Sequence, residues 1–138
     1  MDKVEKAKRS AIMRAVGSKN TGIELRLRRA LHALGYRYRL HVKRLPGSPD
    51  LVFPSRRKIV FVHGCFWHGH GCRLGRLPKS NVDFWSQKVV RNQARDASAI
   101  HLLEQSGWSV LVVWQCEFRD FDSLVERVVA FLLVGNTI

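Results

Sequence analysis

The sequence predicts a three-layer α/β domain in which helices cover the faces of a central mixed β-sheet. Segments with the period of an amphipathic helix alternate with short apolar segments, in the order α-α-β-β-β-α-β-α. Residues 59–62 are all apolar, which is typical of a central strand buried on both faces. Residues 82–105 form a long amphipathic segment and are followed by a second apolar strand. These observations favour a sheet packed between helices.

The chain begins with two predicted helices. Lys3–Val16 is basic and has few residues that could face a core, so it is either an arm that lies on a partner or a frayed terminus; its charge slightly favours the arm. The second helix begins at Asn20 or Thr21, either of which can cap it, and is stopped by Gly35. Its apolar face is formed by Ile23, Leu27, Ala30, Leu31 and Leu34.

Short strands are predicted to follow these helices. Tyr36–Leu40 has the alternation of a strand, and residues 45–49 form a turn that contains two prolines. Asp50–Phe53 and Lys58–Val62 are two further strands, which we expect to pair as a hairpin through residues 54–57. Residues 59–62 then lie in the centre of the sheet.

The C-terminal half combines a polar loop with helices and one strand. His63–Lys79 is rich in Gly, His and Cys and is predicted to be an ordered loop. Val82–Gln105 is a long helix, Ser109–Trp114 a buried strand and Asp120–Val134 a closing helix. One stripe of this amphipathic helix is formed by Trp85, Val89, Asn92, Asp96, Ala99, Ile100 and Leu103. Because no linker or repeat interrupts the 138 residues, we expect a single domain over residues 1–138.

The charge of the chain indicates a polyanionic partner. Lys and Arg total 24 against 11 Asp and Glu, which gives a formal net charge of +13. A surface that repels itself this strongly favours nucleic acid as a partner, ahead of a membrane surface or a merely solvated basic face. No apolar run approaches the roughly 18 residues that span a bilayer, and no N-terminal apolar region resembles a secretory signal. We therefore expect a soluble, intracellular protein without a membrane partner.

The polar loop contains a candidate metal cage. Cys65, His70 and Cys72 lie within eight residues, and Cys116 follows the strand at 109–114. Three thiolates and one imidazole satisfy the tetrahedral preference of structural zinc, and glycines 64, 69, 71 and 75 leave the loop with little core of its own. The alternatives are buried free thiols or a Cys65–Cys72 disulfide, which a reducing compartment disfavours.

A second group of residues has the chemistry of a hydrolytic site. Asp50 opens one predicted strand and His63 follows the next, so the two can meet at one edge of the sheet. Glu24 lies in the first turn of the capped helix, and His68 lies in the polar loop. Carboxylates with a backbone carbonyl are typical magnesium ligands, and a histidine can take a proton from an attacking water. Each residue alone is equally compatible with a structural role, as a turn residue, a helix-dipole partner or a hydrogen-bonded histidine.

Aromatic residues flank the polar loop. Phe66 and Trp67 are adjacent, and Trp85 begins the long helix. Such rings can insert between base steps, most easily at a mismatch where pairing is already weak. The alternative is that Phe66 or Trp85 covers the edge of the core. Trp108 and Trp114 are assigned to packing or to covering the metal loop.

The sequence resembles the very-short-patch repair (Vsr) family of mismatch endonucleases over nearly its whole length. The most specific stretch is Phe61-Val62-His63-Gly64-Cys65-Phe66-Trp67-His68-Gly69-His70-Gly71-Cys72. Further similar segments are Arg9-Ser10 with Met13-Arg14-Ala15, Ile23-Glu24 with Leu27, Leu45-Pro46-Gly47-Ser48-Pro49-Asp50, Phe84-Trp85 with Lys88, Asn92 with Arg95-Asp96, and Gly107-Trp108 through Val113-Trp114 to Cys116.

The resemblance implies a restriction-endonuclease-like fold and a magnesium-dependent enzyme that nicks one strand on the 5′ side of the thymine in a T:G mismatch. It implies that Asp50 and the Val62 carbonyl bind magnesium, that Glu24 acts through metal-bound water, and that His68 activates the attacking water while His63 acts at the phosphate. By the same resemblance, zinc is held by Cys65, His70, Cys72 and Cys116. The rings that intercalate into the DNA are those of Phe66, Trp67 and Trp85. The basic helix of residues 1–18 clamps the DNA and includes Lys8, Arg9 and Arg14. Some relatives carry Thr in place of Val62, which does not matter if only the backbone oxygen binds metal.

The resemblance also suggests a biological setting and two alternatives. We expect a monomer of the bacterial cytoplasm, associated with the nucleoid, acting on mismatched double-stranded DNA in very-short-patch repair of deaminated 5-methylcytosine. Mismatch-repair proteins or a cognate cytosine methyltransferase are possible partners. The alternatives are a non-catalytic zinc-stabilised DNA-binding module, and a restriction or defence nickase with relaxed mismatch selectivity. The joint presence of Asp50, Glu24, His63 and His68 favours catalysis.

Overall fold

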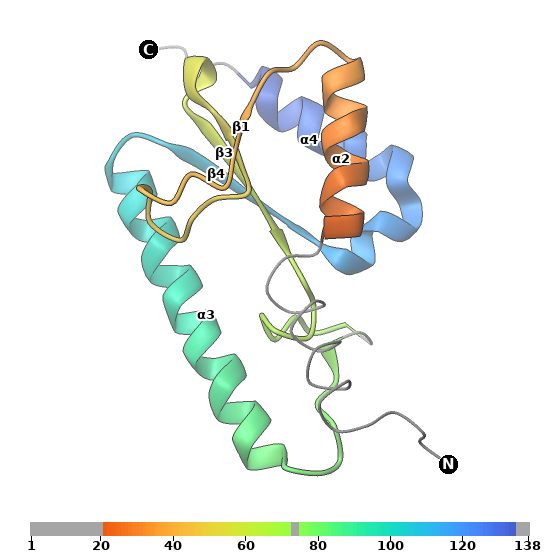
Figure 1. The fold of residues 1–138 in the computed structure, drawn as a ribbon, viewed down its shortest axis with the longest axis vertical. Helices are drawn as coiled ribbons and strands as arrows, with labels where there is room; N and C mark the ends of the chain where they lie inside the picture. Colours follow the sequence, from red (N-terminus) through yellow and green to blue (C-terminus); the bar gives the residue numbers. More distant parts are fainter. Residues whose placement is uncertain (1–20, 73–74, 135–138) are drawn as a thin grey trace.

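A computed structural model describes residues 21–72 and 75–134 as a sheet with helices on both faces (Figure 1). The elements are α2 (Thr21–Ala33), β1 (Arg39–Leu40), β2 (Leu51–Phe53), the 3-10 helix η1 (Pro54–Arg56), β3 (Lys58–His63), α3 (Val82–Gln105), β4 (Ser109–Trp114), the 3-10 helix η3 (Gln115–Asp120) and α4 (Phe121–Leu133). The predicted N-terminal clamp, with Lys8, Arg9 and Arg14, lies outside the described residues.

The four strands form one mixed sheet in the order β1-β2-β3-β4. The β1–β2 and β2–β3 pairs are antiparallel, whereas β3 and β4 are parallel and run in register from Lys58 opposite Ser109 to His63 opposite Trp114. Helices α2 and α4 lie on one face of the sheet, and α3 lies on the other (Figure 1). The predicted three-layer α/β architecture, with β3 in the interior of the sheet, is therefore confirmed.

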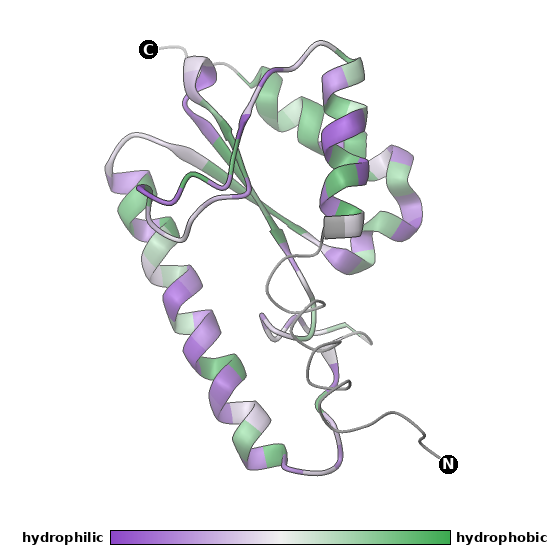
Figure 2. Ribbon diagram, in the orientation of Figure 1, coloured by the Kyte–Doolittle hydropathy of each residue, from purple (hydrophilic) through white to green (hydrophobic). Residues whose placement is uncertain are grey.

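Each face of the sheet has its own core. Between the sheet and α2 and α4, the buried residues include Leu27, Leu31, Phe53, Val60, Val62, Leu124 and Val128; on the α3 side they are Val52, Ile59, Phe61 and Leu103. Hydrophobic residues accordingly follow the strands between the helical layers (Figure 2). Successive side chains of a strand point to opposite faces, so His63 shares the α3 face with Phe61.

Several boundaries differ from the prediction. The expected strand 36–40 pairs only at Arg39–Leu40, because the chain before it is still closing α2. Gly35, with φ of +97°, ends that helix: its N–H donates to the His32 carbonyl, and the Tyr36 N–H donates to the Leu31 carbonyl. Leu34, predicted to lie on the buried face, is therefore past the helix end and is 58% exposed.

The closing helix is also shorter than predicted. Residues Gln115–Asp120 form η3, and α4 begins only at Phe121, where the Asp120 carboxylate caps it by accepting from the Ser123 N–H. The other end of α4 uses one of the basic residues. Lys58 is buried, and its Nζ donates to the carbonyl oxygens of Phe131 and Val134. Burial lowers the pKa of this lysine, which caps a helix rather than adding to the solvated charge.

Among the described residues, none of the helices combines the length and apolar character needed to cross a membrane.

Candidate active site and metal centre

One edge of the sheet collects the residues with metal-binding and proton-transfer chemistry. Because β3 and β4 are parallel, His63 and Trp114 are paired at their carboxyl ends, which brings the loop after His63 next to Cys116. Because β2 runs antiparallel to β3, Asp50 at the start of β2 lies beside Val62. In the described residues this edge holds three groups whose ligand atoms lie within 4.8 Å of one another: Cys65, His70, Cys72 and Cys116; His63, His68 and Asp96; and Glu24, His41 and Asp50.

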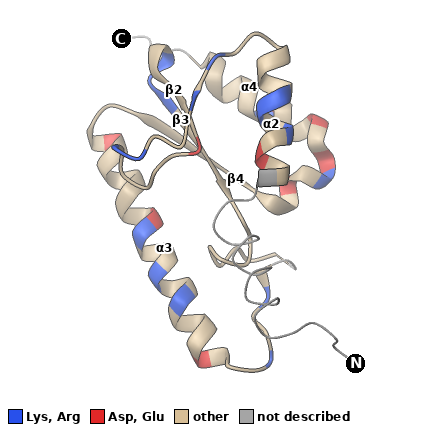
Figure 3. Cartoon of the chain, viewed as in Figure 1, with Lys and Arg blue, Asp and Glu red and all other residues tan. Residues whose placement is uncertain are grey.

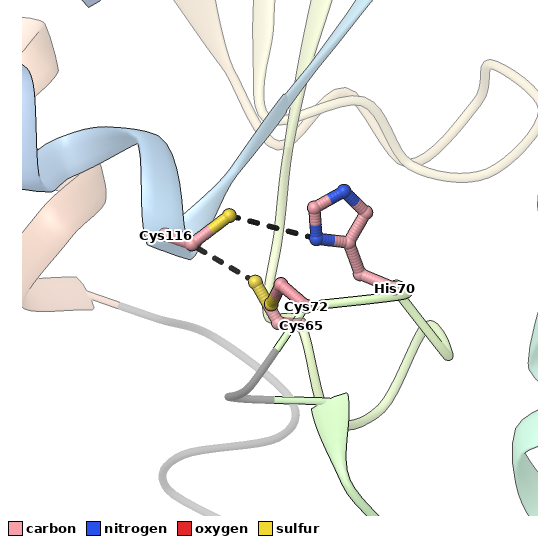
Figure 4. A group of neighbouring side chains, drawn as sticks. All are labelled: Cys65, His70, Cys72 and Cys116. Carbon is pink, nitrogen blue, oxygen red and sulfur yellow. Dashed lines mark hydrogen bonds between the residues drawn. The ribbon is translucent and has the colours of Figure 1, made fainter.

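The four predicted cage residues meet as expected (Figure 4). The Cys116 Sγ lies 3.5 Å from His70 Nδ1, and the Cys116 N–H donates to the Cys65 Sγ at 3.4 Å. All three cysteines are free thiols, so the Cys65–Cys72 disulfide considered as an alternative is not formed. The group can hold a metal ion.

The donor set and its surroundings fit zinc. Burial raises the pKa of the Cys65 thiol to about 12, so the thiolate needs a cation to form. The Trp114 ring stacks on the His70 imidazole at 4.2 Å with an interplanar angle of 13°, which fixes the ring and confirms that Trp114 covers the loop. A Cβ at Gly75 would lie 2.0 Å from the His70 carbonyl oxygen, so this tight loop accepts only glycine there. Three sulfur donors and one imidazole are a closed structural set.

The cluster of Glu24, His41 and Asp50 is built around Asp50. Its Oδ2 accepts a 2.7 Å hydrogen bond from the Val62 N–H. Burial raises its pKa to about 6; the Val62 hydrogen bond opposes this shift, and the neighbouring Glu24 carboxylate adds to it. The N–H and C=O of one strand residue point to the same side, so the Val62 carbonyl also points toward β2. Two close carboxylates and a carbonyl form an environment that a divalent cation would stabilise.

Glu24 is the most buried member of this group. Its side chain is 3% exposed and projects from the first turns of α2. The Oε2 atom accepts hydrogen bonds from His41 Nε2 at 3.0 Å and from Arg28 Nη1 at 3.5 Å. Glu24 and Asp50 thus lie in one cluster, with His41 between them.

The cluster of His63, His68 and Asp96 lies on the face of the sheet that α3 covers. The His63 and His68 rings stack with centroids 3.8 Å apart and an interplanar angle of 4°. His68 Nδ1 donates to Asp96 Oδ2 at 2.5 Å. Burial lowers the pKa of His63 to about 4, and its Nδ1 has no hydrogen-bond partner in the described part of the chain. These three residues line a pocket of about 370 Å³ together with Gln93, Ile100 and Trp114.

The cluster around Asp50 and the cluster of His63, His68 and Asp96 lie next to each other. The Asp50 carboxylate binds the Val62 N–H, one residue before His63, and His63 stacks on His68, so the two clusters adjoin at the end of β3. A cation-binding carboxylate and an imidazole oriented by a second carboxylate are the parts that phosphodiester hydrolysis needs. The predicted association of Asp50 with His63 and His68 at one sheet edge therefore agrees with the structure.

The three aromatic residues form a cluster beside this edge. Phe66, Trp67 and Trp85 contact one another edge to face, with centroids 5.1–5.6 Å apart. Phe66 and Trp85 are partly exposed, but Trp67 is 7% exposed and its Nε1 has no hydrogen-bond partner among the described residues. Trp67 is buried in this conformation, because its ring packs against both other rings and beneath the Lys88 ammonium group. Only two of the three predicted wedge residues offer exposed ring surface here.

Two residues of the site were not singled out by the sequence analysis. Asp96 was named in the stripe of the long helix and in a family-like segment but was given no role; a carboxylate among the largely apolar residues of that stripe is the signal that could have identified it. His41 lies in an irregular segment between β1 and the turn, and nothing in the local pattern distinguishes it.

A mixed sheet between helices, with carboxylates and histidines gathered at one edge and a Cys/His cluster beside them, is an architecture of the restriction-endonuclease-like class that could hold metal ions. The profile of the DNA mismatch endonuclease Vsr family matches residues 1–74. The Type II nicking enzyme V.XorIIP of Xanthomonas oryzae pv. oryzae is 55% identical over 91% of this chain and 93% of its own length. The DNA mismatch endonuclease Vsr of Escherichia coli is 41% identical over 89% of this chain and 79% of its own length. The Type II nicking enzyme V.NmeAIP of Neisseria meningitidis is 45% identical over 83% of this chain and 81% of its own length.

This chain belongs to the Vsr family of DNA endonucleases. The family resemblance stated from the sequence is confirmed, and a purely DNA-binding module is not the class to which these relatives belong.

Proposed function

We propose that this protein nicks one strand of double-stranded DNA on the 5′ side of the thymine in a T:G mismatch, with magnesium as cofactor, and so initiates repair of deaminated 5-methylcytosine. The observation that carries the proposal is the position of Asp50, which accepts a hydrogen bond from the Val62 N–H of β3, one residue before the His63 that stacks on the Asp96-bound His68. The name of the Escherichia coli relative supports mismatched DNA as substrate.

In this proposal each side chain has a distinct task. Asp50 and the Val62 carbonyl would hold magnesium, with Glu24 acting through its water; the bound ion would neutralise charge developing on the phosphate. The His68 Nδ1–H donates a hydrogen bond to Asp96, so Nε2 carries the lone pair that can accept a proton from the attacking water. His63 is kept neutral by burial and is stacked on His68, which suits a role at the phosphate. Cys65, His70, Cys72 and Cys116 would hold a structural zinc.

The DNA would lie across the aromatic cluster and the basic residues of α3. Lys88, Arg91 and Arg95 are exposed and recur at helical spacing, so they form a basic stripe on that helix (Figure 3). The stripe would contact phosphates, while Phe66 and Trp85 would enter the distorted base step; Trp67 would join them only if the cluster opens. The clamp of residues 1–18, a monomeric state and the single domain over 1–138 stay predictions of the sequence. So do the mismatch-repair or methyltransferase partners and the nucleoid association.

A nicking assay tests this function. Duplexes that differ only in one pair, T:G or T:A, would be labelled on either strand, incubated with the protein and magnesium, and separated on a denaturing gel. We expect one nick, in the thymine strand of the T:G duplex, on the 5′ side of that thymine. Equal nicking of the T:A duplex would contradict mismatch selectivity. It would support the second candidate, a nickase with relaxed selectivity, which the name Type II nicking enzyme of two of these relatives favours.

The Asp96→Asn substitution should slow nicking by about 10²-fold, because an amide no longer fixes the His68 tautomer and no longer stabilises its protonated form. DNA affinity, measured by gel shift, should stay unchanged. The matched control is Glu104→Gln, which neutralises an exposed carboxylate on the same helix. If Asp96→Asn nicks as fast as this control, His68 does not depend on Asp96 for its orientation.

Removing one exposed ring should weaken mismatch recognition. For Phe66→Ala and Trp85→Ala we expect the preference for T:G over T:A duplexes to fall by roughly 10-fold each, since a base stacked on an aromatic ring contributes about 1–3 kcal/mol. Fluorescence anisotropy with both duplexes measures this ratio. Leu102→Ala, which truncates an exposed apolar side chain on α3, should leave the ratio unchanged. An unaltered ratio in both ring variants would remove the wedge from the proposal.

A further inference from the structure

The cluster of Glu24, His41 and Asp50 contains a third potential ligand, His41, which the proposed magnesium site does not use. His41 follows β1 and lies between Glu24 and Asp50. Its Nε2 is 3.0 Å from Glu24 Oε2, and its Nδ1 is 3.8 Å from Asp50 Oδ1. The imidazole is partly exposed, at 28%, whereas the Glu24 carboxylate behind it is almost completely buried.

The two ring nitrogens of His41 have different surroundings. Nε2 donates a hydrogen bond to the buried Glu24 carboxylate, so in the neutral ring Nδ1 carries a lone pair. The 3.8 Å from Nδ1 to Asp50 is too long for a hydrogen bond but suits two atoms that share one cation. A histidine that binds a metal with one nitrogen and donates the other N–H to a carboxylate is a common arrangement at metal sites.

The backbone also holds His41 against Asp50. The His41 N–H donates to the Asp50 carbonyl at 3.2 Å. Its φ of +46° lies in the left-handed region, which non-glycine residues rarely adopt. Such conformations persist where surrounding contacts enforce them, and they often occur at functional sites. The imidazole is therefore positioned at this centre by its main chain as well as by its hydrogen bond to Glu24.

We propose that His41 is a direct nitrogen ligand of the Asp50 cation centre, through Nδ1, and that the centre consequently binds a first-row transition ion such as Mn²⁺ more tightly than the Mg²⁺ of the proposed function. The inference rests on the proposed function, because it takes Asp50 to be a metal ligand. Mg²⁺ demands hard oxygen donors, whereas an imidazole nitrogen favours transition ions. Glu24 then has a second role, as the carboxylate that orients the His41 ring.

Mn²⁺ is the probe for this ligand, because its electron spin detects directly bound nitrogen. Protein with one equivalent of zinc already bound would be titrated with Mn²⁺, alone and in competition with Mg²⁺, and followed by electron paramagnetic resonance. Wild-type protein should bind Mn²⁺ at least about 10-fold more tightly than Mg²⁺. Its electron spin echo modulation should show ¹⁴N coupling of a bound imidazole. His41→Gln should lose that coupling and reduce the preference to about parity.

Two further variants make the result decisive. His41→Gly also removes the imidazole, and glycine adopts the positive φ of this position without steric cost. This variant should therefore fold even where His41→Gln does not. His101→Gln removes an exposed imidazole from α3 and should match wild type. Persistence of the ¹⁴N coupling in either His41 variant, or its absence from wild type, would overturn the assignment of His41. Asp50→Asn tests the underlying site separately: if it still binds Mn²⁺ as wild type does, the proposed cation centre itself is wrong.

Discussion

Asp50→Asn should reduce the rate of nicking by at least about 10³-fold while leaving DNA affinity nearly unchanged. A cation that neutralises phosphate charge supplies several kcal/mol of transition-state stabilisation, and each 1.36 kcal/mol corresponds to a factor of ten in rate. The asparagine keeps the size of the side chain and can still accept the hydrogen bond from the Val62 N–H, so the β2–β3 pairing is retained. Single-turnover nicking of a T:G duplex and a gel shift without metal measure the two quantities.

The control for this variant is Asp122→Asn, which neutralises an exposed carboxylate in the first turn of α4. It should nick at the wild-type rate, which separates the effect of Asp50 from a general gain of positive charge. Since burial raises the pKa of Asp50, removing its charge should not destabilise the fold in the absence of metal. A normal nicking rate in Asp50→Asn would show that this carboxylate does not hold the catalytic cation.

Cys116→Ser should lower the free energy of unfolding by more than about 4 kcal/mol, the size of effect expected when a structural metal is lost. Cys116 lies just after β4 and meets Cys65, His70 and Cys72 of the loop that follows β3, so the metal would link these two segments. The loop that follows β3 carries Phe66, Trp67 and His68, and its release should also abolish nicking. Urea denaturation and zinc content per chain are the measurements.

Chelation provides a matched test without a substitution. A strong zinc chelator should destabilise wild-type protein to the level of Cys116→Ser, and added Zn²⁺ should restore only the wild type. The sequence contains three cysteines, and all of them lie in this cluster, so no other thiol can replace the missing ligand. If zinc-free wild type unfolds at the same urea concentration as the zinc-loaded form, the cluster is not a structural metal site.

Local patterns in the sequence were sufficient for most of the secondary structure. The predicted bounds of the long helix and of the strand at 109–114 are those of α3 and β4, because amphipathic period and apolar runs are properties of neighbouring residues. The strand at 36–40 was predicted too long, since pairing with β2 leaves only two of its residues in the sheet. Strand length of this kind depends on a partner that local sequence does not specify.

The chemistry of the site could likewise be assigned from residue types, but its connections could not. Cys65, His70, Cys72 and Cys116 could be proposed as a metal-ligand set from their side chains and spacing, beside the alternatives of free thiols or a disulfide. That His68 is oriented by Asp96, and that His41 lies between Glu24 and Asp50, depends on contacts across 28 and 17 residues of chain. The burial of Trp67 depends in the same way on the position of Trp85.

The sequence by itself determined the class of fold and the set of reactive side chains, because these follow from hydrophobic period and from the donor atoms that each residue type carries. The family followed from the resemblance of particular stretches, above all residues 61–72. Only the tertiary structure decided which of those atoms face one another. The physical reason is the parallel register of β3 with β4 and the antiparallel register of β2 with β3, which bring Asp50, His63 and Cys116 to one edge of the sheet.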